Sequence, residues 1–575
     1  MDWIFQATDS EQAKSLSMAL NIHPAVCARL IQIDERFSVP EAAESFLKPR
    51  LANLDDPFNI THLRDAVDRV HQALVRNERI VVFGDYDVDG VSSTTLLVSI
   101  LRRFGNSPNY CIPLRSEEGY GLSTNAIERA LSDIEKPHLF IALDCGTNSV
   151  GEITKLREQG IDILVVDHHQ STKEMKLPWL IVNPHLFDPE DAPWKNLCTV
   201  GLTFKLVHGL IKKLRLMGDE SAEQIDLRQF LDLVALGTVA DLVPLKEENR
   251  ILASRGLRSL YHTKRCGIHA LFQVSGIDLA EVDALRPSDV AFRLGPRINA
   301  SGRLSDASIP VEMLLGTDFK DCTRQAAQLD SMNRERQAIE RAITTEAMQN
   351  IEDLGPEALG LVAYSDDWHP GVVGIVASRV SRHYHRPAII LGEDGDMAKG
   401  SGRSIAGIDL VAVLEKCDDL LDHWGGHPMA VGVSVSRANI DAFRERFAEA
   451  IAKIHPKGLP EANIEIATKI SPDMISEEFV EDIEELQPFG QLNPEPVFAI
   501  GPVTLLMPPS VFGKGHVRFQ MEQKSGDRIS CIAWNQSHKV PPIRRPLTLA
   551  AQIGWNVWNG ERSIQATVQD WRFAD

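Results

Sequence analysis

A short apolar run that leads into three alternating aspartates constrains this chain more than any other segment. Residues 80–83 (IVVF) are continuously apolar, as in a strand that is buried on both faces of a parallel sheet. Asp85, Asp87 and Asp89 follow at once, and in extended chain such side chains point the same way. Their charges would repel one another unless cations lay between them. An Asx-rich turn would explain one aspartate after a strand, but three in alternation favour a metal site.

A calcium-binding EF-hand loop also carries alternating acids and is a second candidate for this segment. Such a loop requires a glutamate at its twelfth position. In a loop that starts at Asp85, the twelfth residue is Leu96. The EF-hand is therefore excluded, and a metal site of another kind is favoured.

Two further apolar runs end in polar residues. Residues 141–143 lead into Asp144, and residues 163–166 lead into the triplet Asp-His-His at 167–169. Asp241 ends an apolar helical stretch. In open parallel sheets, ligand sites form beyond the carboxyl ends of the strands, so these side chains should meet at one edge. Each alone could be a helix cap or a buried, hydrogen-bonded acid, but their concurrence favours a common site.

The residue types in this set indicate which metal it would hold. Many carboxylates with few imidazoles and no thiolate form a hard-oxygen site, which favours Mn²⁺ or Mg²⁺ over zinc or copper. The ligands are too many for one octahedral ion that must keep water, so we expect two ions. Two ions about 3.5–4 Å apart are suited to the hydrolysis of phosphoesters.

Length and composition limit the class of protein. A chain of 575 residues should form about three to five domains. It has no apolar run near the roughly 18 residues of a membrane span, and its first residues carry no export signal. The eight cysteines form no C-x-x-C pair, so they should be free thiols in a reducing compartment. We therefore expect a cytoplasmic protein with no membrane partner.

The net charge of −20 argues weakly against a nucleic-acid partner. The charge is uneven, however, because residues 501–575 hold nine Lys and Arg against five Asp and Glu, a net of +4. Bound cations would also offset the acidic ligands. A local basic channel therefore stays compatible with the acidic composition.

The patterning along the chain predicts an α/β protein. Strand and helix signals alternate in the first half, which is typical of a largely parallel sheet. Residues 319–350 lack Gly and Pro and follow Asp318, so they should form one long capped helix that joins two domains. A smaller α/β domain and a C-terminal β-barrel follow. The predicted limits are 1–60 for an N-terminal helical segment, 61–317 for the catalytic domain, 318–355 for the connecting helix, 356–457 for the second domain and 462–575 for the barrel.

Several motifs resemble those of the DHH phosphoesterase superfamily. DYDVDG (85–90) and DHH (167–169) are similar to its motifs one and three, and LDCG (143–146) and GTVADLVPL (237–245) resemble motifs two and four. Other branches place a histidine a few residues ahead of the paired aspartates, where this chain has Asp85. The resemblance implies these metal ligands: Asp85, Asp87, Asp89, Asp144, His168 and Asp241. It makes Asp87, Asp89, Asp144, His168, His169 and Asp241 the catalytic residues, with His169 contacting substrate phosphate and Asp167 orienting a histidine.

Four later segments are similar to the single-strand DNA exonuclease branch of this superfamily. They are 295–303 (GPRINASGR), 368–379 (WHPGVVGIVASR), 400–404 (GSGRS) and 425–432 (GGHPMAVG), of which the last three fall in a DHHA1-type domain. The resemblance implies these substrate-binding residues: His169, Arg297, Asn299, Arg303, Ser401, Arg403 and His427.

The physical properties of these segments agree with that implication. Glycines around Ser401 and Arg403 would let backbone N–H groups approach an anion, and an arginine can clamp a phosphate. Gly371 and Gly374, near the start of a helix, could bind an anion similarly. Ordinary turns and interdomain salt bridges explain the same residues, and His427 alone would more often be a hydrogen-bonded structural histidine. Within the second domain, strands are expected at 359–364, 388–391 and 430–435.

The resemblance also implies an activity. It predicts processive removal of nucleotides from the 5′ end of single-stranded DNA in recombination and repair, with two Mn²⁺ or Mg²⁺ ions in a cleft between the two α/β domains. It further implies single-strand DNA-binding protein and a RecQ-type helicase as partners. One alternative is a DHH pyrophosphatase, cyclic-dinucleotide esterase or short-oligonucleotide phosphodiesterase. The other is an inactive DHH scaffold, against which the intact acidic motifs argue.

The resemblance places an OB-fold in the C-terminal barrel. Single strands bind such folds through stacking on aromatic rings together with cations. Aromatic residues that fill the core of the barrel explain the same pattern equally well. The candidates are Phe512, Lys514, Arg518, Phe519, Trp534 and Trp558.

Overall fold

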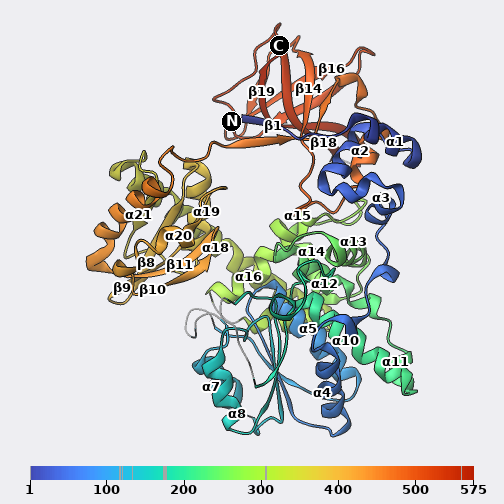
Figure 1. Cartoon of the computed structure of the whole chain (residues 1–575), viewed down its shortest axis with the longest axis vertical. Helices are drawn as coiled ribbons and strands as arrows, with labels where there is room; N and C mark the ends of the chain where they lie inside the picture. The colour runs from blue at the N-terminus through green and yellow to red at the C-terminus, as the bar shows by residue number, and fades with distance from the viewer. Residues whose placement is uncertain are drawn as a thin grey trace.

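The computed structural model shows three bodies, with an α/β domain at the bottom of Figure 1, a second α/β domain at its side and a β-barrel above. This is the predicted fold class. The domain limits given above stay predictions. The structure describes residues 2–114, 118, 121–132, 134–171, 178–304, 307–558 and 560–574, without the side chains of 303, 304 and 558.

The sheet of the first domain contains five strands, all parallel to their neighbours. Leu143 lies beside Gly84 on one side and Val166 on the other, so three strands end level with one another. The order is β3 (Asn109–Cys111), β2 (Ile80–Gly84), β4 (Leu139–Leu143), β5 (Asp162–Val166) and β6 (Leu180–Val182).

Helices cover both faces of this sheet, which explains why its strands are apolar throughout. Successive residues of a strand face opposite sides of the sheet. Val82 and Ile141 therefore belong to one core, and Phe83 and Phe140 belong to the other. The larger core contains α4 (Leu63–Val75), α5 (Val88–Arg103), α10 (Thr199–Leu216), α12 (Leu231–Ala240), α13 (Glu247–Tyr261), α14 (Cys266–Ser275) and α17 (Ser308–Leu315). The smaller core contains α7 (Thr124–Ser132) and α8 (Val150–Glu158).

Shorter helices complete the first domain. A π-helical segment, Val290–Leu294, leads into the helix that carries the predicted GPRINASGR motif. The helices are α9 (Pro184–Phe187), α11 (Glu220–Glu223), α15 (Pro287–Asp289) and α16 (Gly295–Leu304).

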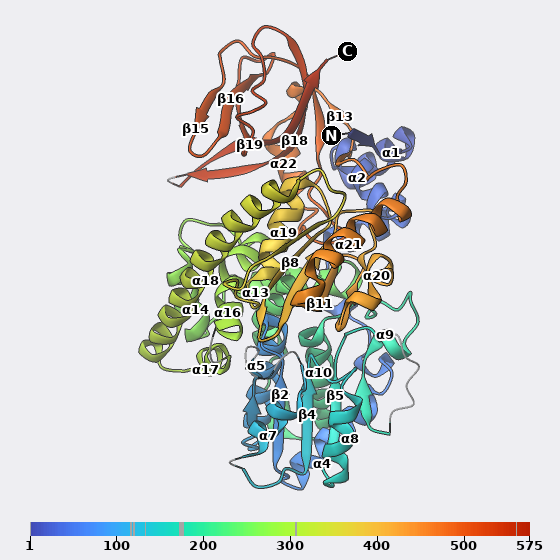
Figure 2. The same ribbon diagram turned by 90° about the vertical axis from the view of Figure 1, so that its left-hand side faces the viewer.

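The connecting helix is one continuous element, α18 (Phe319–Leu354), which confirms the predicted long helix. The side chain of Asp318 accepts hydrogen bonds from the backbone N–H groups of Lys320 and Asp321, as an N-cap does. The helix ends at Gly355, whose φ of 105° suits glycine. Its first half packs against the first domain and its second half against the second (Figure 2).

The second sheet is mixed, with one parallel pair and three antiparallel pairs. Its order is β10 (His423–His427), β11 (Ala430–Ser436), β9 (Met397–Arg403), β8 (Ala388–Asp394) and β7 (Leu361–Tyr364). Helix α19 (Val373–Tyr384) covers one face, and α20 (Leu410–Leu414) and α21 (Ile440–Ile454) cover the other.

Two of these strands, β9 and β10, were not predicted. Both are rich in glycine, which is depleted in strands and common in turns. In β9 the glycines allow close packing, because a Cβ on Gly400 would lie 2.0 Å from the carbonyl oxygen of Ile390. A Cβ on Gly402 would lie 2.6 Å from a methyl group of Val431. The glycines therefore belong to a tightly packed sheet rather than to a loop.

The C-terminal barrel shares its core with the N-terminal helices, although the two regions lie at opposite ends of the sequence. Leu16, Val26 and Phe46 pack with Phe498 and Leu549 of the barrel. The helices are α1 (Ser10–Leu20), α2 (Pro24–Ile33), α3 (Pro40–Leu47) and α22 (Glu477–Glu484). The strands, in sheet order, are β13 (Lys469–Ile470), β14 (Phe498–Thr504), β18 (Pro546–Trp558), β19 (Glu561–Phe573), β17 (Arg528–Ala533), β16 (His516–Glu522) and β15 (Ser510–Phe512).

The first residues form a strand where short helices were expected. Strand β1 (Asp2–Phe5) pairs in parallel with β12 (Asn463–Ile466), and the indole of Trp3 donates a hydrogen bond to Asp570. This long-range pairing replaces local helix formation. Among the described residues, no single helix is long and apolar enough to cross a bilayer, and only the bent pair α1 and α2 reaches that length and composition together.

Candidate metal centre

Three neighbouring strands deliver carboxylates to one edge of the first sheet. Asp85, Asp144 and Asp167 are the residues directly after β2, β4 and β5, and each is buried. The backbone N–H of Asp85 donates to the carbonyl of Leu143 at 3.2 Å, and that of Asp144 donates to Val166 at 3.0 Å. The backbone hydrogen bonds between the strands therefore extend to Asp85 and Asp144 and hold their positions. Asp144 has a φ of 64°, an unfavourable value for a residue with a side chain.

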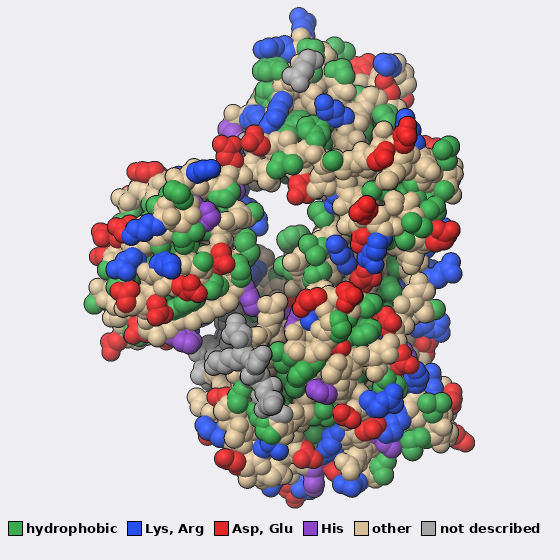
Figure 3. Space-filling model, viewed as in Figure 1, with side chains coloured by type: hydrophobic (Ala, Val, Ile, Leu, Met, Phe, Trp, Pro, Cys, Tyr) green, Lys and Arg blue, Asp and Glu red, His purple; other side chains and the backbone are tan. Residues whose placement is uncertain are grey.

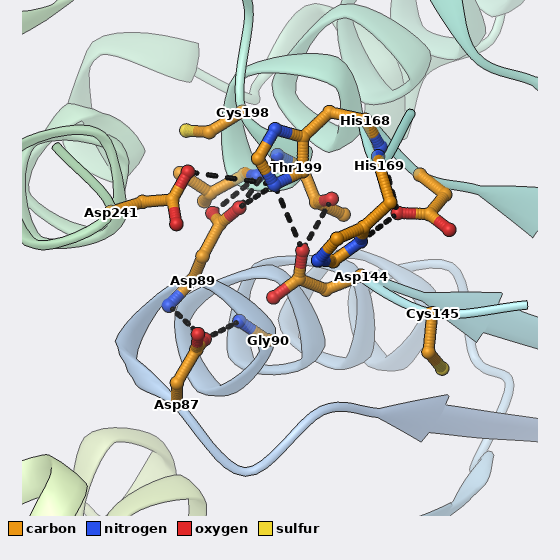
Figure 4. A network of polar contacts seen from close by, with 12 residues as sticks. Asp87, Asp89, Gly90, Asp144, Cys145, His168, His169, Cys198, Thr199 and Asp241 are labelled. Atoms are coloured by element: carbon orange, nitrogen blue, oxygen red, sulfur yellow. Dashed lines mark hydrogen bonds and ion pairs between the residues drawn. The ribbon is translucent and has the colours of Figure 1, made fainter. Parts of the chain in front are cut away.

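Two further aspartates are held by helix N-termini. Asp87 is the N-cap of α5 and accepts hydrogen bonds from the backbone N–H groups of Asp89 and Gly90 at 2.9 and 3.1 Å (Figure 4). Asp89 in turn accepts from the N–H groups of Thr199 and Val200, at the start of α10, at 2.7 and 2.8 Å. Helix N-termini favour negative charge, so both carboxylates are stabilised in place.

Two glycines of the motifs permit this crowding. A Cβ on Gly90 would lie 2.4 Å from the backbone oxygen of Asp85. A Cβ on Gly237, in α12, would lie 2.8 Å from a carboxylate oxygen of Asp89. Neither position leaves room for a side chain, because Gly90 lies against the backbone of Asp85 and Gly237 lies against the carboxylate of Asp89.

The side chains fall into groups whose oxygen and nitrogen atoms lie within 4.8 Å of one another. Nε2 of His168 is 3.4 Å from Asp144, 3.5 Å from Asp241 and 3.9 Å from Asp89, so it stands between carboxylates from different elements (Figure 4). The groups are Asp85, Asp87 and Asp144; Asp89, His168 and Asp241; and Asp144, His168 and His169.

Burial and mutual repulsion disturb the acids. Burial, and then the charge of Asp87, raises the pKa of Asp85, and burial with the charge of Asp144 raises the pKa of Asp87 to about 7. Burial, followed by the charge of Asp144, also raises the pKa of both Asp89 and Asp241. For Asp144 burial acts in the same direction, but His168 outweighs it and holds the pKa below its usual value. Cations among these groups would relieve the repulsion.

Asp85 gives the clearest sign that a cation belongs here. Both of its carboxylate oxygens are buried and lack a well-formed hydrogen-bond partner among the described residues, although the backbone N–H of Tyr86 lowers its pKa slightly. Buried polar atoms are otherwise satisfied in folded proteins, and an absent ion is one explanation for an exception. The donor set is rich in oxygen and fits two hard divalent cations.

Asp167 is not in any of these groups and instead fixes the histidine pair. Its carboxylate accepts hydrogen bonds from the backbone of His168 at 2.8 Å and of His169 at 3.1 Å, and from Nδ1 of His169 at 2.7 Å. Burial opposes ionisation of both partners, but their attraction lowers the pKa of Asp167 and raises that of His169 to about 11. The histidine oriented by Asp167 is therefore His169.

Three polar residues that sequence reasoning missed support the site. The hydroxyl of Thr199 donates to Asp144 at 2.9 Å, and the backbone N–H of Thr147 donates to Asp167 at 3.0 Å. Asn183 donates to the hydroxyl of Thr147 and to the carbonyl of His169, both at 2.9 Å. Their roles depend on tertiary contacts, and only the position of Thr199 at a helix start was visible in the sequence.

Comparison with known proteins places this geometry in a family. Family models match as "DHH family, N-terminal domain" at residues 79–238, "DHHA1 domain" at 359–453 and "RecJ OB domain" at 466–570. The single-stranded-DNA-specific exonuclease RecJ of Bacillus subtilis is 34% identical over 100% of this chain and 72% of its own length. The chain belongs to the RecJ family. The RecJ proteins of Dickeya dadantii and Escherichia coli are 37% and 36% identical, with coverage of 91% and 89% of this chain and 92% and 90% of theirs.

The RecJ fold extends over the whole chain. The crystal structure of Thermus thermophilus RecJ in complex with Mn²⁺ matches with a TM-score of 0.83 and 27% identity, covering 100% of this chain and 80% of that one. The same protein in complex with Mg²⁺ matches with a TM-score of 0.77 and 26% identity, covering 100% and 79%. The predicted membership of the DHH superfamily and of its single-strand exonuclease branch is therefore confirmed.

The RecJ motif on α16 lies close to the carboxylate edge. A Cβ on Gly295 would be 3.6 Å from Ala240, which precedes Asp241, and 3.7 Å from Val88, which follows Asp87. Arg297 donates to Asp330 of α18 and to two backbone carbonyls, so its contacts join helices. Oδ1 of Asn299 is buried and has no hydrogen-bond partner among the described residues. The side chain of Arg303 lies outside the described residues.

In the second domain, three predicted residues lie on one face of the sheet. Arg403 and His427 both pair with Ala430, from opposite sides, so they lie in one row across three strands. Ser401 lies in the next row, opposite Gly432. The expectation that backbone N–H groups around Ser401 and Arg403 would approach an anion is wrong, because β9 is paired on both sides and its backbone N–H groups bond within the sheet. Side chains, not backbone groups, are available on this face.

Helix α19 covers only part of this face. A Cβ on Gly374 would lie 3.2 Å from the hydroxyl of Ser401 and 3.3 Å from the guanidinium of Arg403, which brings two motifs together. Beyond the helix, Gly425 and His427 are exposed. The surface of the uncovered part of this face is therefore formed by glycine, and Arg403 and His427 lie at its border.

The barrel divides the predicted aromatics into two kinds. Phe519 is only 5% exposed and belongs to the core, whereas Trp534 is 50% exposed. Trp534 contacts Phe512 and His516, with ring centroids 6.2 and 4.9 Å apart, and Arg518 lies over the ring of Phe512. The side chain of Trp558 lies outside the described residues, and Lys514 is exposed in the turn between β15 and β16.

Proposed function

We propose that this RecJ-family chain is a metal-dependent exonuclease that removes nucleotides from the 5′ end of single-stranded DNA, in recombination and repair. The observation that carries the proposal is the cluster of buried aspartates at one sheet edge, in which the carboxylate oxygens of Asp85 lack a well-formed hydrogen-bond partner among the described residues. The relatives named above are single-stranded-DNA-specific exonucleases. The Thermus thermophilus structures contain Mn²⁺ or Mg²⁺, the two ions expected for this ligand set.

Two of the ligand groups would each hold one ion, and Asp144 and His168 stand between them. Asp144 belongs to the group of Asp85 and Asp87, and it also contacts His168 of the other group. When bound, two such ions lower the pKa of a water molecule and stabilise charge on phosphate oxygens. The protein supplies fixed carboxylates for this purpose, because strand ends and helix N-termini hold them before any ion binds.

His169 is suited to contact the substrate phosphate. The contact with Asp167 holds Nδ1 and therefore orients the Nε2 edge of the ring beside Asp144. In the metal-free site the charge of Asp167 raises the pKa of His169 against the effect of burial, and a cationic ring held in place attracts phosphate. We propose this role for His169, with Asp167 as its positioning residue.

The second domain and the barrel would hold the rest of the strand. Ser401, Arg403 and His427 present a hydroxyl and two cation-capable groups on one sheet face, and a buried oxygen of Asn299 has no hydrogen-bond partner in the part of the chain that the structure describes. The contact of Arg297 with α18 supports a structural role for this residue, in addition to the predicted contact with substrate. Figure 3 shows an opening between the two α/β domains and the barrel, which would admit a single strand.

Two finer expectations remain part of this proposal. We propose single-strand DNA-binding protein and a RecQ-type helicase as partners, as the family resemblance implies. We propose a cytoplasmic location, which the eight free thiols support, since such thiols persist in reducing compartments.

The test uses one long single-stranded oligonucleotide that carries distinguishable labels at its two ends. With Mn²⁺, the 5′ label should be released first, duplex DNA should be spared, and EDTA should stop the reaction. Rapid hydrolysis of a dinucleotide or of pyrophosphate, with the long strand left intact, would support the short-substrate alternative instead. No hydrolysis of any of these substrates, with DNA still bound, would indicate an inactive scaffold.

A further inference from the structure

A basic groove lies in the first domain at the far end of the helices that carry the metal ligands. It has a volume of about 860 Å³ and is lined by seven Lys and Arg side chains and two acids. Helix α5 (Val88–Arg103) extends from its N-cap Asp87 to Arg103, and α12 (Leu231–Ala240) extends from Leu231 to its C-cap Asp241. At 1.5 Å per residue, the groove is roughly 15–25 Å from the ligands. Figure 1 places α13, which lines it, on the side turned away from α20 and α21.

The positive charge of this distal groove is largely unbalanced. Arg228 pairs with Asp226, and Arg265 pairs with Asp232. The other five cations form no ion pair with a carboxylate among the described residues; they are Arg50, Arg103, Arg255, Arg258 and Lys264. In a chain with a net charge of −20, five excess cations around one groove are not explained by composition.

Helix-terminal charge accounts for only part of this cluster. Arg103 ends α5, and Arg258 lies in the last turn of α13, where cations stabilise the helix dipole. Arg50 and Lys264 lie in loops outside these helices and have no such role. Arg103 and Arg265 both lie over the ring of Phe230, 5.2 and 5.3 Å from its centroid, and burial with the charge of Arg265 lowers the pKa of Arg103. The groove therefore keeps a repulsion that an anionic ligand would relieve.

The side chains of the groove indicate the kind of anion. Guanidinium groups outnumber ammonium groups, and they bind phosphate oxygens through two parallel hydrogen bonds. The described lining residues include no Phe, Tyr or Trp, and Phe230 is buried beneath Arg103 and Arg265. Such a surface contacts phosphates without stacking on bases, so it would not depend on sequence.

We propose that the distal groove binds the phosphate backbone of DNA outside the catalytic cleft, as a second anchor for the substrate. This inference rests on the proposed function, because it takes DNA as the polyanion. A substrate long enough to reach both places would be held at both. A dinucleotide, which cannot span roughly 15–25 Å, would use the metal site alone.

The experiment removes three exposed cations of the groove together, in the variant Arg50→Gln/Arg258→Gln/Lys264→Gln. Binding of a long fluorescent single strand is measured by anisotropy in EDTA over a range of salt concentrations. The slope of log affinity against log salt should become shallower by about 2, because each phosphate contact contributes about 0.7. The variant Lys14→Gln/Lys155→Gln/Lys457→Gln changes the net charge equally at exposed sites elsewhere, and it should keep the original slope.

Hydrolysis of a dinucleotide with Mn²⁺ is measured for all three proteins and should be equal, which shows that the variants are folded. An unchanged salt slope in the groove variant would overturn the proposal. A groove variant that lost affinity for polyglutamate while keeping its DNA slope would also overturn it, in favour of an acidic protein ligand. Failure of the proposed function is distinguishable, because the unmodified protein would then leave the long strand undegraded in Mn²⁺, whatever its salt slope in EDTA.

Discussion

The two α/β domains place their functional side chains on different parts of a sheet. In the DHH domain, Asp85, Asp144 and Asp167 follow the carboxyl ends of parallel strands. In the DHHA1 domain, Arg403 and His427 lie within antiparallel strands, in one row across the sheet. Residues beyond strand ends can converge on a point, which suits small ions. Rows on a face keep a fixed spacing, which suits an extended chain of phosphates.

The largest expected effect comes from the convergent site. The variant Asp144→Asn keeps the size of the side chain but removes a carboxylate that contacts both ligand groups. We expect hydrolysis of single-stranded DNA to fall by a factor on the order of 10³ or more, with DNA binding in EDTA unchanged. End-label release and anisotropy measure the two quantities. The matched variant Asp191→Asn, at an exposed position, should behave as the original protein, and normal hydrolysis by Asp144→Asn would remove the basis for a two-ion site.

The difference between the domains also explains what could be predicted from the sequence. A buried strand followed by Asp is a local pattern, so the acids of β2, β4 and β5 were identified from their neighbours alone. The glycines of β9 and β10 resemble turns locally, and only pairing with β8 and β11 makes them strands. The bond from Thr199 to Asp89 spans 110 residues, so no local pattern indicates it.

The second prediction concerns a glycine that close packing requires. In Gly90→Ala the new methyl group would meet the backbone of Asp85 at 2.4 Å, and backbone cannot move aside as a side chain can. We expect a loss of about 1–3 kcal/mol in the free energy of unfolding and weaker Mn²⁺ binding. Urea unfolding and metal titration measure these. Gly151→Ala in α8, where a Cβ meets nothing within 4 Å, is the control, and equal behaviour of the two variants would contradict the packing argument.

The third prediction is a pH dependence of the metal-free protein. The folded state raises the pKa of Asp87 to about 7 and that of His169 to about 11, so it binds more protons than the unfolded state between pH 5 and 8. Stability therefore falls as pH rises through this window, by about 5 kcal/mol. The lowered pKa of Asp167 adds a constant contribution there, since that group is already ionised in both states.

Urea midpoints at several pH values, in EDTA and in Mn²⁺, measure this dependence. Bound ions should flatten or reverse it, because metal binding requires deprotonated ligands. The variant Asp87→Asn should reduce the dependence in EDTA, since asparagine also caps helices but does not titrate. A metal-free protein that became more stable from pH 5 to pH 8 would show that the repulsion among the acids is relieved without cations.

The smallest expected effect tests the face of the DHHA1 sheet. A Cβ on Gly425 meets nothing within 4 Å, and one on Gly432 meets its nearest atom at 4.0 Å, so packing does not require glycine at either position. Both lie in the row of Ser401, on the open part of the face. If single-stranded DNA lies over these two glycines, an added methyl group would hold the DNA away from Arg403 and His427. Gly425→Ala and Gly432→Ala should then raise KM for DNA on the order of tenfold, while the urea midpoint of unfolding stays within error.

The control variant Gly151→Ala should change neither KM nor the urea midpoint. An unchanged KM in both variants would mean that DNA does not lie over these glycines, and that the DHHA1 face holds its substrate at the edge formed by Arg403 and His427.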